Sequence, residues 1–178
     1  MYFGGIWGGQ LQRWASGSYN AEGGNTDLQN DAVAALTPRV ARMRGDMLEF
    51  AETPRAVVIN DAEGHPLLGG DHDRRFFEGT WTFRRGDTYY LTYSTGDTHY
   101  LVYATGTSPY GPFTYQGRIL EPVEGWTSHH SIFEQNGQWY LAYHDTQLSG
   151  RTHLRNVKIT PLTFNEDGSI QTINPMRD

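Results

Sequence analysis

The sequence has 178 residues, enough for one domain of ordinary size with its own core. Its net charge of −6, with no run of Lys or Arg longer than a pair, argues against nucleic acid or an anionic membrane as a partner. The absence of Cys excludes disulfides and thiolate metal sites. No apolar run approaches the length of a membrane span. No signal peptide is visible, so we expect a cytoplasmic location if the chain start is native and leave the location open otherwise.

Aromatic residues make up 13 % of the chain and 21 residues are Gly, a combination typical of short twisted strands joined by tight turns. Aromatic side chains in such a protein either fill the core or stack on the flat apolar faces of sugars. Composition alone favours neither alternative.

The predicted elements are strands along the whole chain. Residues 1–12 are apolar and strand-like from the first position, which suggests missing sequence upstream because most domains begin with loosely held polar residues. Turn signals interrupt residues 13–45, and two short strands are expected at 47–50 and 55–60. The later expected strands, separated by turns rich in Gly, Asn and Asp, are 80–84, 88–94, 100–105, 114–117, 131–134, 138–145, 152–160 and 170–173. Asn136-Gly137 is a strong hairpin signal.

Two segments repeat one another at an offset of 50 residues. Phe83 and the run 89–93 match Phe133 and the run 139–143. A repeat of this length, built from short strands, is typical of a β-propeller blade. We therefore predict an all-β fold and one partial propeller domain over residues 1–178. Its expected parts are an incomplete blade at 1–70, a blade with Glu78 at 71–125 and a blade with His129 at 126–178; a β-sandwich is the alternative.

Glu78 is the candidate for chemistry, because it lies among Phe76, Phe77 and Trp81 at the head of a predicted strand. Apolar surroundings disfavour the charged form of a carboxyl group, which is the property that a general acid needs. The repeat aligns Glu78 with Ser128, next to His129-His130. Innermost strands of a propeller line a central channel, so these positions converge on one site. Adjacent residues in a strand point to opposite faces, so only one of the two His side chains faces the channel.

The remaining polar residues are weaker candidates. We interpret most of them as solvated loop or strand-end residues: Asp71, His72, Asp73, Asp97, His99, His144 and Asp145. Arg155 lies in an apolar run, where a cation needs a partner. Motifs of a zinc protease, a P-loop or a serine hydrolase are absent.

Several motifs, in order along the chain, resemble glycoside hydrolase family 43, most closely its β-xylosidase and α-L-arabinofuranosidase members. The motifs are Phe76-Phe77-Glu78-Gly79-Thr80-Trp81, Ser108-Pro109-Tyr110-Gly111-Pro112-Phe113, Gly125-Trp126-Thr127-Ser128-His129-His130-Ser131-Ile132, Trp139-Tyr140-Leu141-Ala142-Tyr143-His144 and Leu154-Arg155-Asn156-Val157. The resemblance implies a five-bladed β-propeller that hydrolyses glycosides with inversion, using an Asp base, a Glu acid and a second Asp that tunes the acid.

Carried over by motif, the resemblance gives Glu78 the role of the general acid. It places His129 at a channel position that is associated with a water or, through water, with calcium; no other cofactor is expected. The residues expected to contact an oligosaccharide or glycoside substrate are Trp81, Trp7, Trp126, Arg155 and His130.

The resemblance covers only the C-terminal half of the family domain, roughly blades three to five, and the motifs of both Asp residues are missing. Inverting hydrolysis needs two carboxyl groups about 6.5–9.5 Å apart. One hypothesis is a homo-oligomer that covers the open propeller edges and builds a composite site, with Asp71, Asp73 or Asp97 as the substitute base. The alternatives are a fragment that binds sugars without cleaving them, and a split piece completed by a second chain. We favour the self-associated glycosidase because the acid motif is intact.

Overall fold

The protein is an all-β structure, as the sequence predicted. The computed structural model describes residues 1–6, 11–14, 16–23, 31–126 and 128–175. The only helical segment among these is the short 3₁₀ turn η2, Gln12–Trp14, and no helix among them is long and apolar enough to cross a membrane. The strands are β1 Tyr2–Phe3, β2 Arg39–Val40, β3 Arg55–Ala56, β4 Ile59–Asn60, β5 Glu78–Arg85, β6 Thr88–Ser94, β7 Leu101–Gly106, β8 Phe113–Leu120, β9 His130–Gln135, β10 Gln138–Asp145 and β11 Asn156–Leu162.

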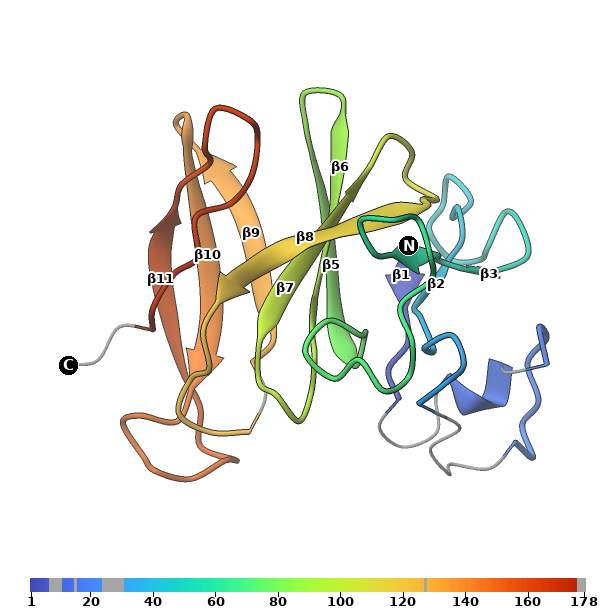
Figure 1. Ribbon diagram of the computed structural model, residues 1–178, viewed down its shortest axis with the longest axis horizontal. Coiled ribbons are helices and arrows are strands. Elements are labelled where there is room, and N and C mark those ends of the chain that lie inside the picture. Colours follow the sequence, from blue (N-terminus) through green and yellow to red (C-terminus); the bar gives the residue numbers. More distant parts are fainter. Residues whose placement is uncertain (7–10, 15, 24–30, 127, 176–178) are drawn as a thin grey trace.

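These strands form three sheets that stand side by side (Figure 1). Their strand orders are β1-β2-β3, β4-β8-β7-β6-β5 and β11-β10-β9. The edge strand β5 lies next to β9 of the third sheet and next to β1 of the first. The blades of a β-propeller are arranged around a central channel, so the first strands of adjacent blades lie next to one another as β1, β5 and β9 do here.

The internal repeat appears in the structure as two equivalent hairpins. Phe83 pairs with Tyr90 across β5–β6, and Phe133 pairs with Tyr140 across β9–β10. The second hairpin turns through Asn136-Gly137, whose φ angles of 53° and 80° fit the primed turn that this dipeptide predicts. Residues 50 positions apart therefore occupy the same place in the β5–β6 and β9–β10 hairpins.

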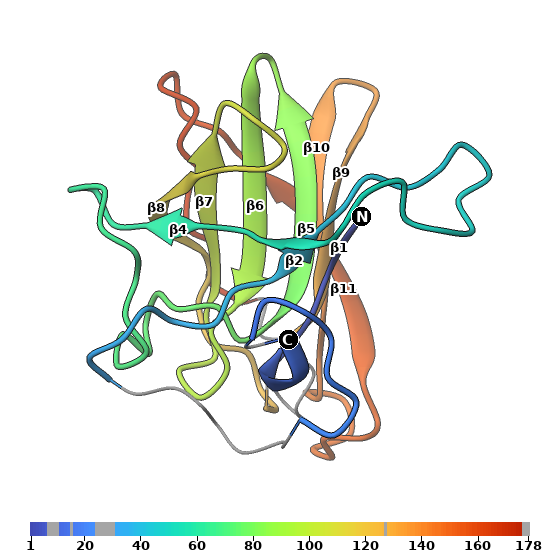
Figure 2. The same cartoon turned by 90° about the vertical axis from the view of Figure 1, so that its right-hand side faces the viewer.

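Some strand boundaries differ from those expected. β4 pairs in parallel with β8 of the second sheet (Figure 2), although we placed its residues with the first segment. Residues 47–50 lie in turns and contribute only the isolated bridge of Phe50 to Met43, and Ile170 and Ile173 likewise form isolated bridges. The last strand begins at Asn156 instead of at residue 152. Short segments with few backbone partners are where β propensity alone is a weak guide.

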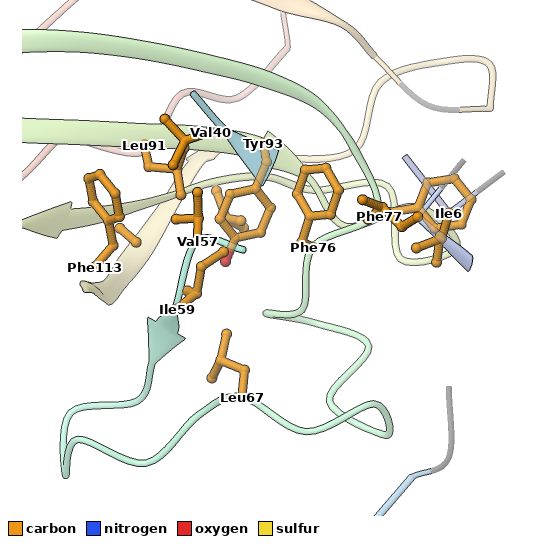
Figure 3. Packing of buried hydrophobic residues seen from close by; sticks show 13 residues of the cluster. Ile6, Val40, Val57, Ile59, Leu67, Phe76, Phe77, Leu91, Tyr93 and Phe113 are labelled. Carbon is orange, nitrogen blue, oxygen red and sulfur yellow. The ribbon is translucent and has the colours of Figure 1, made fainter. Parts of the chain in front are cut away.

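The second sheet is buried on both faces, which gives the protein two cores. Along β7, Val102 and Ala104 point into the first core, whereas Leu101 and Tyr103 point into the second. The first core packs the second sheet against the first; Figure 3 shows its members Ile6, Val40, Val57, Ile59, Leu67, Phe76, Phe77, Leu91, Tyr93 and Phe113. The second core packs the second sheet against the third through Ile132, Leu141, Tyr143 and Leu162.

The burial of Leu141 predicts a large loss of stability on truncation. Leu141 is 0 % exposed in the second core, so Leu141→Ala should lower the free energy of unfolding by about 2–5 kcal/mol, measured by chemical denaturation. The matched control is Leu148→Ala, because Leu148 is 76 % exposed and the same change there should stay within about 0.5 kcal/mol. Equal losses at both positions would contradict the assignment of the core.

Candidate active site

Glu78 and His129 meet where the second and third sheets adjoin. Glu78 is the first residue of β5, and His129 immediately precedes β9. Glu78 Oε1 lies 3.3 Å from His129 Nε2, with the Glu side chain 22 % exposed and the His side chain 52 % exposed. Gly79, next to Glu78, has a φ of +71°, a left-handed conformation that favours glycine. The structure thus brings Glu78 to the residue that directly follows Ser128, its counterpart in the repeat.

His144 and Arg155 extend the site on the third sheet. His144 Nε2 accepts a hydrogen bond from the backbone N–H of His129 at 2.9 Å, and it lies 3.2 Å from Arg155 Nη1. A guanidinium only donates, so Nε2 must be the unprotonated nitrogen and the ring is the neutral Nδ1–H tautomer. Burial, followed by the charge of Arg155, lowers the pKa of His144 to about 4, in agreement with a neutral ring. Arg155, for which the sequence predicted a partner, also donates from Nε to the Thr152 carbonyl at 3.0 Å.

His130 points away from Glu78, into the junction between the sheets. Its Nε2 lies 2.6 Å from Thr92 Oγ1, and Thr92 Oγ1 also lies 3.2 Å from the Trp81 carbonyl, to which it donates. Burial, and then the neighbouring His129, lower the pKa of His130 to about 3. The structure therefore places His130 in a contact between β6 and β9, although we expected it to contact the substrate.

The tryptophans expected to bind sugar differ in their surroundings. Trp81 donates its indole N–H to the Ile132 carbonyl at 3.0 Å while its side chain stays 38 % exposed, so it both joins β5 to β9 and presents a face. Trp126 is 46 % exposed and packs edge-to-face with His99, with 4.9 Å between the ring centroids. His99 Nδ1 also contacts the Trp126 carbonyl. Trp7 lies outside the described residues.

The three carboxylates considered as substitute bases each lie near a basic side chain. Asp71 Oδ2 lies 2.5 Å from Arg74 Nη2, and Asp97 Oδ2 lies 2.6 Å from His72 Nδ1. Asp73 makes a long contact of 3.9 Å with Arg118. In the part of the chain that the structure describes, none of the three pairs with Glu78 or His129. The partners of Asp71 and Asp97 lie in the loops around them, and that of Asp73 lies on β8.

A calcium ion held directly by this chain does not fit the described residues. Calcium takes six to eight oxygen ligands, and the described residues contain no group of three or more His, Asp or Glu side chains that is placed to hold a metal. His129 offers a ring nitrogen, and its carboxylate partner is Glu78. We therefore derive no catalytic step through calcium.

Comparisons with known proteins identify the family of this chain. The model of glycosyl hydrolases family 43 matches residues 35–170. The chain belongs to this family. It is 54 % identical to the xylosidase/arabinosidase 43A of Humicola insolens, over 98 % of this chain and 55 % of the relative, and 54 % identical to a xylosidase/arabinosidase of Bacteroides ovatus, over 97 % and 53 %. This family-43 chain thus spans about half the length of the curated relatives that it matches.

Solved structures give the same result. A family-43 β-xylosidase/α-arabinofuranosidase from a compost microbial metagenome, solved with xylotriose in a calcium-free form, superposes with a TM-score of 0.94 at 60 % identity. The match covers 100 % of this chain and 55 % of that one. An enzyme from Xanthomonas citri, solved with xylose and with xylotriose, gives 0.91 at 55 % identity, over 98 % and 52 % of the two chains.

His144 and Asp145 of the third sheet, which we interpreted as solvated, are engaged in contacts. His144 contacts His129 and Arg155, and Asp145 is only 2 % exposed. The repeat contained a signal for His144, because it corresponds to Ser94, the partner of Glu78 across β5–β6. No local pattern marks Asp145, whose partners lie on β11 and in the turn after β10.

The lowered pKa values of His130 and His144 predict acid destabilisation. In the unfolded chain both rings titrate near pH 6.5, but in the folded chain they titrate near 3 and 4, so below about pH 6.5 the unfolded state binds more protons. Stability should therefore fall as pH drops from 7 to 5, by about 1–2 kcal/mol for each ring. Urea denaturation at several pH values measures the slope. His130→Gln with His144→Gln should flatten it, whereas His153→Gln, at an exposed position, should leave it unchanged.

Proposed function

We propose that this chain supplies the general-acid side of a glycosidase active site that acts on xylo- or arabino-configured oligosaccharides or glycosides. The observation that carries the proposal is the contact of the partly buried Glu78 with His129, at the junction of two sheets. A carboxylic acid in this position can protonate the oxygen of a leaving group. Membership in family 43 and the names of the relatives, xylosidase/arabinosidase and β-xylosidase, support this substrate class.

The side chains around Glu78 suit a sugar substrate. Trp81 and Trp126 present exposed aromatic surface, and Arg155 is an exposed cation held beside His144. Aromatic faces with a few polar donors are what a carbohydrate pocket requires. The complexes of the Xanthomonas citri enzyme with xylose and xylotriose support a pocket of this kind.

We propose that the general base is supplied by a part of the enzyme that is not in contact with Glu78 within this chain. An inverting enzyme places its second carboxyl group about 6.5–9.5 Å from the first. Asp71, Asp73 and Asp97 are the residues of this sequence that we proposed for that role. Asp71 would first have to leave its contact with Arg74, and Asp97 its contact with His72. A second subunit, or the segment that completes a five-bladed propeller, is the source that we favour.

Exposed apolar surface at the outer sheets supports an association of this kind. Val157 and Ile159 of β11 are 72 % and 56 % exposed, and Phe50, 37 % exposed, stacks on Phe3 of β1. Open sheet faces and edges of this kind are usually covered by another element or subunit. A carbohydrate-binding protein without hydrolytic activity, or a split piece that needs a different chain, remains the alternative.

A substrate panel with Glu78→Gln tests the acid role. With aryl xylosides and arabinosides whose leaving group is poor, the variant should lose about 10²–10⁴ in kcat, because protonation of the leaving oxygen is lost. With a dinitrophenyl leaving group, which needs little protonation, the loss should be much smaller. The matched control is Glu134→Gln, an exposed carboxylate on β9, which should keep wild-type rates.

The same panel separates the alternatives. Equal rates for wild type and Glu78→Gln on every substrate would remove Glu78 as the acid. Calorimetric binding of xylotriose by the wild type without any turnover would support the sugar-binding alternative instead.

Light scattering coupled to gel filtration tests self-association. We expect the purified chain to form at least a dimer, because Val157 and Ile159 expose apolar surface. Val157→Lys with Ile159→Lys should give monomers, while Thr172→Lys, at an exposed position outside the strands, should not. A wild-type chain that runs as a clean monomer at all concentrations would rule out the homo-oligomer.

A further inference from the structure

A buried ion pair lies beside the acid site and takes no part in the contacts of Glu78. Asp145 Oδ2 lies 3.2 Å from Lys158 Nζ, and their side chains are only 2 % and 8 % exposed. Lys158 Nζ also donates to Gln147 Oε1. Charges this deep need complete partnering, because removal from water disfavours them strongly.

The carboxylate of Asp145 holds three segments together. Its Oδ1 accepts hydrogen bonds from Asn156 Nδ2 at 2.6 Å and from the backbone N–H of Gln147 at 3.2 Å. Asn156 in turn accepts from the backbone N–H of Leu148 at 3.3 Å through its Oδ1. The side chain of Asp145 therefore adds to the backbone pairing of β10 with β11 and ties the following turn to both strands.

Each of these segments carries or touches a residue of the site. His144 directly precedes Asp145, and Arg155 directly precedes Asn156. The turn reaches the segment before His129, because the backbone N–H of Thr146 donates to the Glu124 carbonyl at 2.9 Å. Gly125 leaves room for this contact, since a Cβ there would lie 3.0 Å from Thr146 Cγ2.

The fold does not need the charges of Asp145 and Lys158 for its stability. A buried ion pair can often be replaced by apolar residues of similar shape without loss of stability, whereas removal of one partner is strongly destabilising. The hydrogen-bond acceptor of Asp145 has no such substitute, because Asn156 and Gln147 would lose their partner. The acceptor, more than the charge, is therefore what can set the positions of neighbouring residues.

We propose that Asp145 is a positioning residue, whose Oδ1 sets His144 and Arg155 against His129 and thereby against Glu78. The proposal rests on the glycosidase function for its kinetic consequence. Its structural consequence is the hydrogen bond from the His129 N–H to His144 Nε2, which is independent of turnover.

Two double variants of the full chain separate the acceptor from the charge. Asp145→Asn with Lys158→Met keeps an Oδ1 acceptor and removes both charges. Asp145→Leu with Lys158→Met removes the acceptor as well, at similar side-chain volume. We expect the first to retain the wild-type chemical shift and exchange protection of the His129 amide proton in NMR spectra, and kcat/KM within about threefold of wild type. The second should lose the amide protection and about tenfold to a hundredfold in kcat/KM.

The outcomes decide the proposal in each case. If the Leu/Met variant keeps the His129 amide shift and the rate, Asp145 has only a structural role and the proposal is wrong. If the Asn/Met variant also loses the amide shift and the rate, the charge matters and not the acceptor, and the proposal is again wrong. Should the Leu/Met variant fail to fold, Asn156→Ala leaves the ion pair intact and should still weaken the His129 amide protection; an unchanged amide would overturn the proposal. A wild type without turnover would contradict the glycosidase function, but the amide comparison would still test the positioning role.

Discussion

The arrangement of the site depends on how two edge strands meet. β5 and β9 end their respective sheets, so no backbone ladder joins them. Side chains make the connection instead: the Trp81 indole N–H donates to the Ile132 carbonyl, and Thr92 Oγ1 lies 2.6 Å from His130 Nε2. Glu78 begins β5 and His129 precedes β9, so these bonds between the sheets fix the distance between Glu78 and His129. Ile132 and Leu141 pack against the second sheet and hold the two strands that make these hydrogen bonds in place.

The three histidines near this junction have different tasks because their surroundings differ. His130 lies between the sheets, and His144 lies between the Arg155 guanidinium and the His129 backbone N–H. Burial lowers the pKa of both rings, and the charge of Arg155 lowers that of His144 further, so both rings are neutral at physiological pH. A cationic ring in either place would face Arg155 or lack solvation. His129 is half exposed and is the imidazole that contacts Glu78. The carboxyl group of Glu78 therefore contacts one ring, that of His129, while His144 bonds the His129 backbone and His130 joins β9 to β6.

The sequence predicted the fold class and the central contact because both leave periodic signals. The repeat of Phe83 and Phe133 set two hairpins in register, and Asn136-Gly137 marked the turn between β9 and β10. The same register aligned Glu78 with Ser128, next to His129. The role of Asp145 had no such signal, since its partners Gln147 and Lys158 are brought to it by a turn and by the pairing of β10 with β11. Charged residues at strand ends are usually solvated, so only the three-dimensional structure distinguishes this one from its neighbours.

The electrostatics of the described residues also bear on the missing carboxylate. A general base must keep a lone pair free for the proton of a water molecule, yet Asp71 already lies 2.5 Å from the Arg74 guanidinium and Asp97 lies 2.6 Å from the His72 ring. Asp73 has a looser partner at 3.9 Å, but that partner is Arg118 of β8, and β8 is separated from β5 by β7 and β6 within the sheet. The proposed acid side thus draws on β5, β9, β10 and the start of β11, and we propose that the base is a carboxylate introduced from another direction. The exposed faces of Val157 and Ile159 on one outer sheet, and of Phe50 beside the other, are where an additional sheet or subunit can pack and bring that carboxylate toward Glu78.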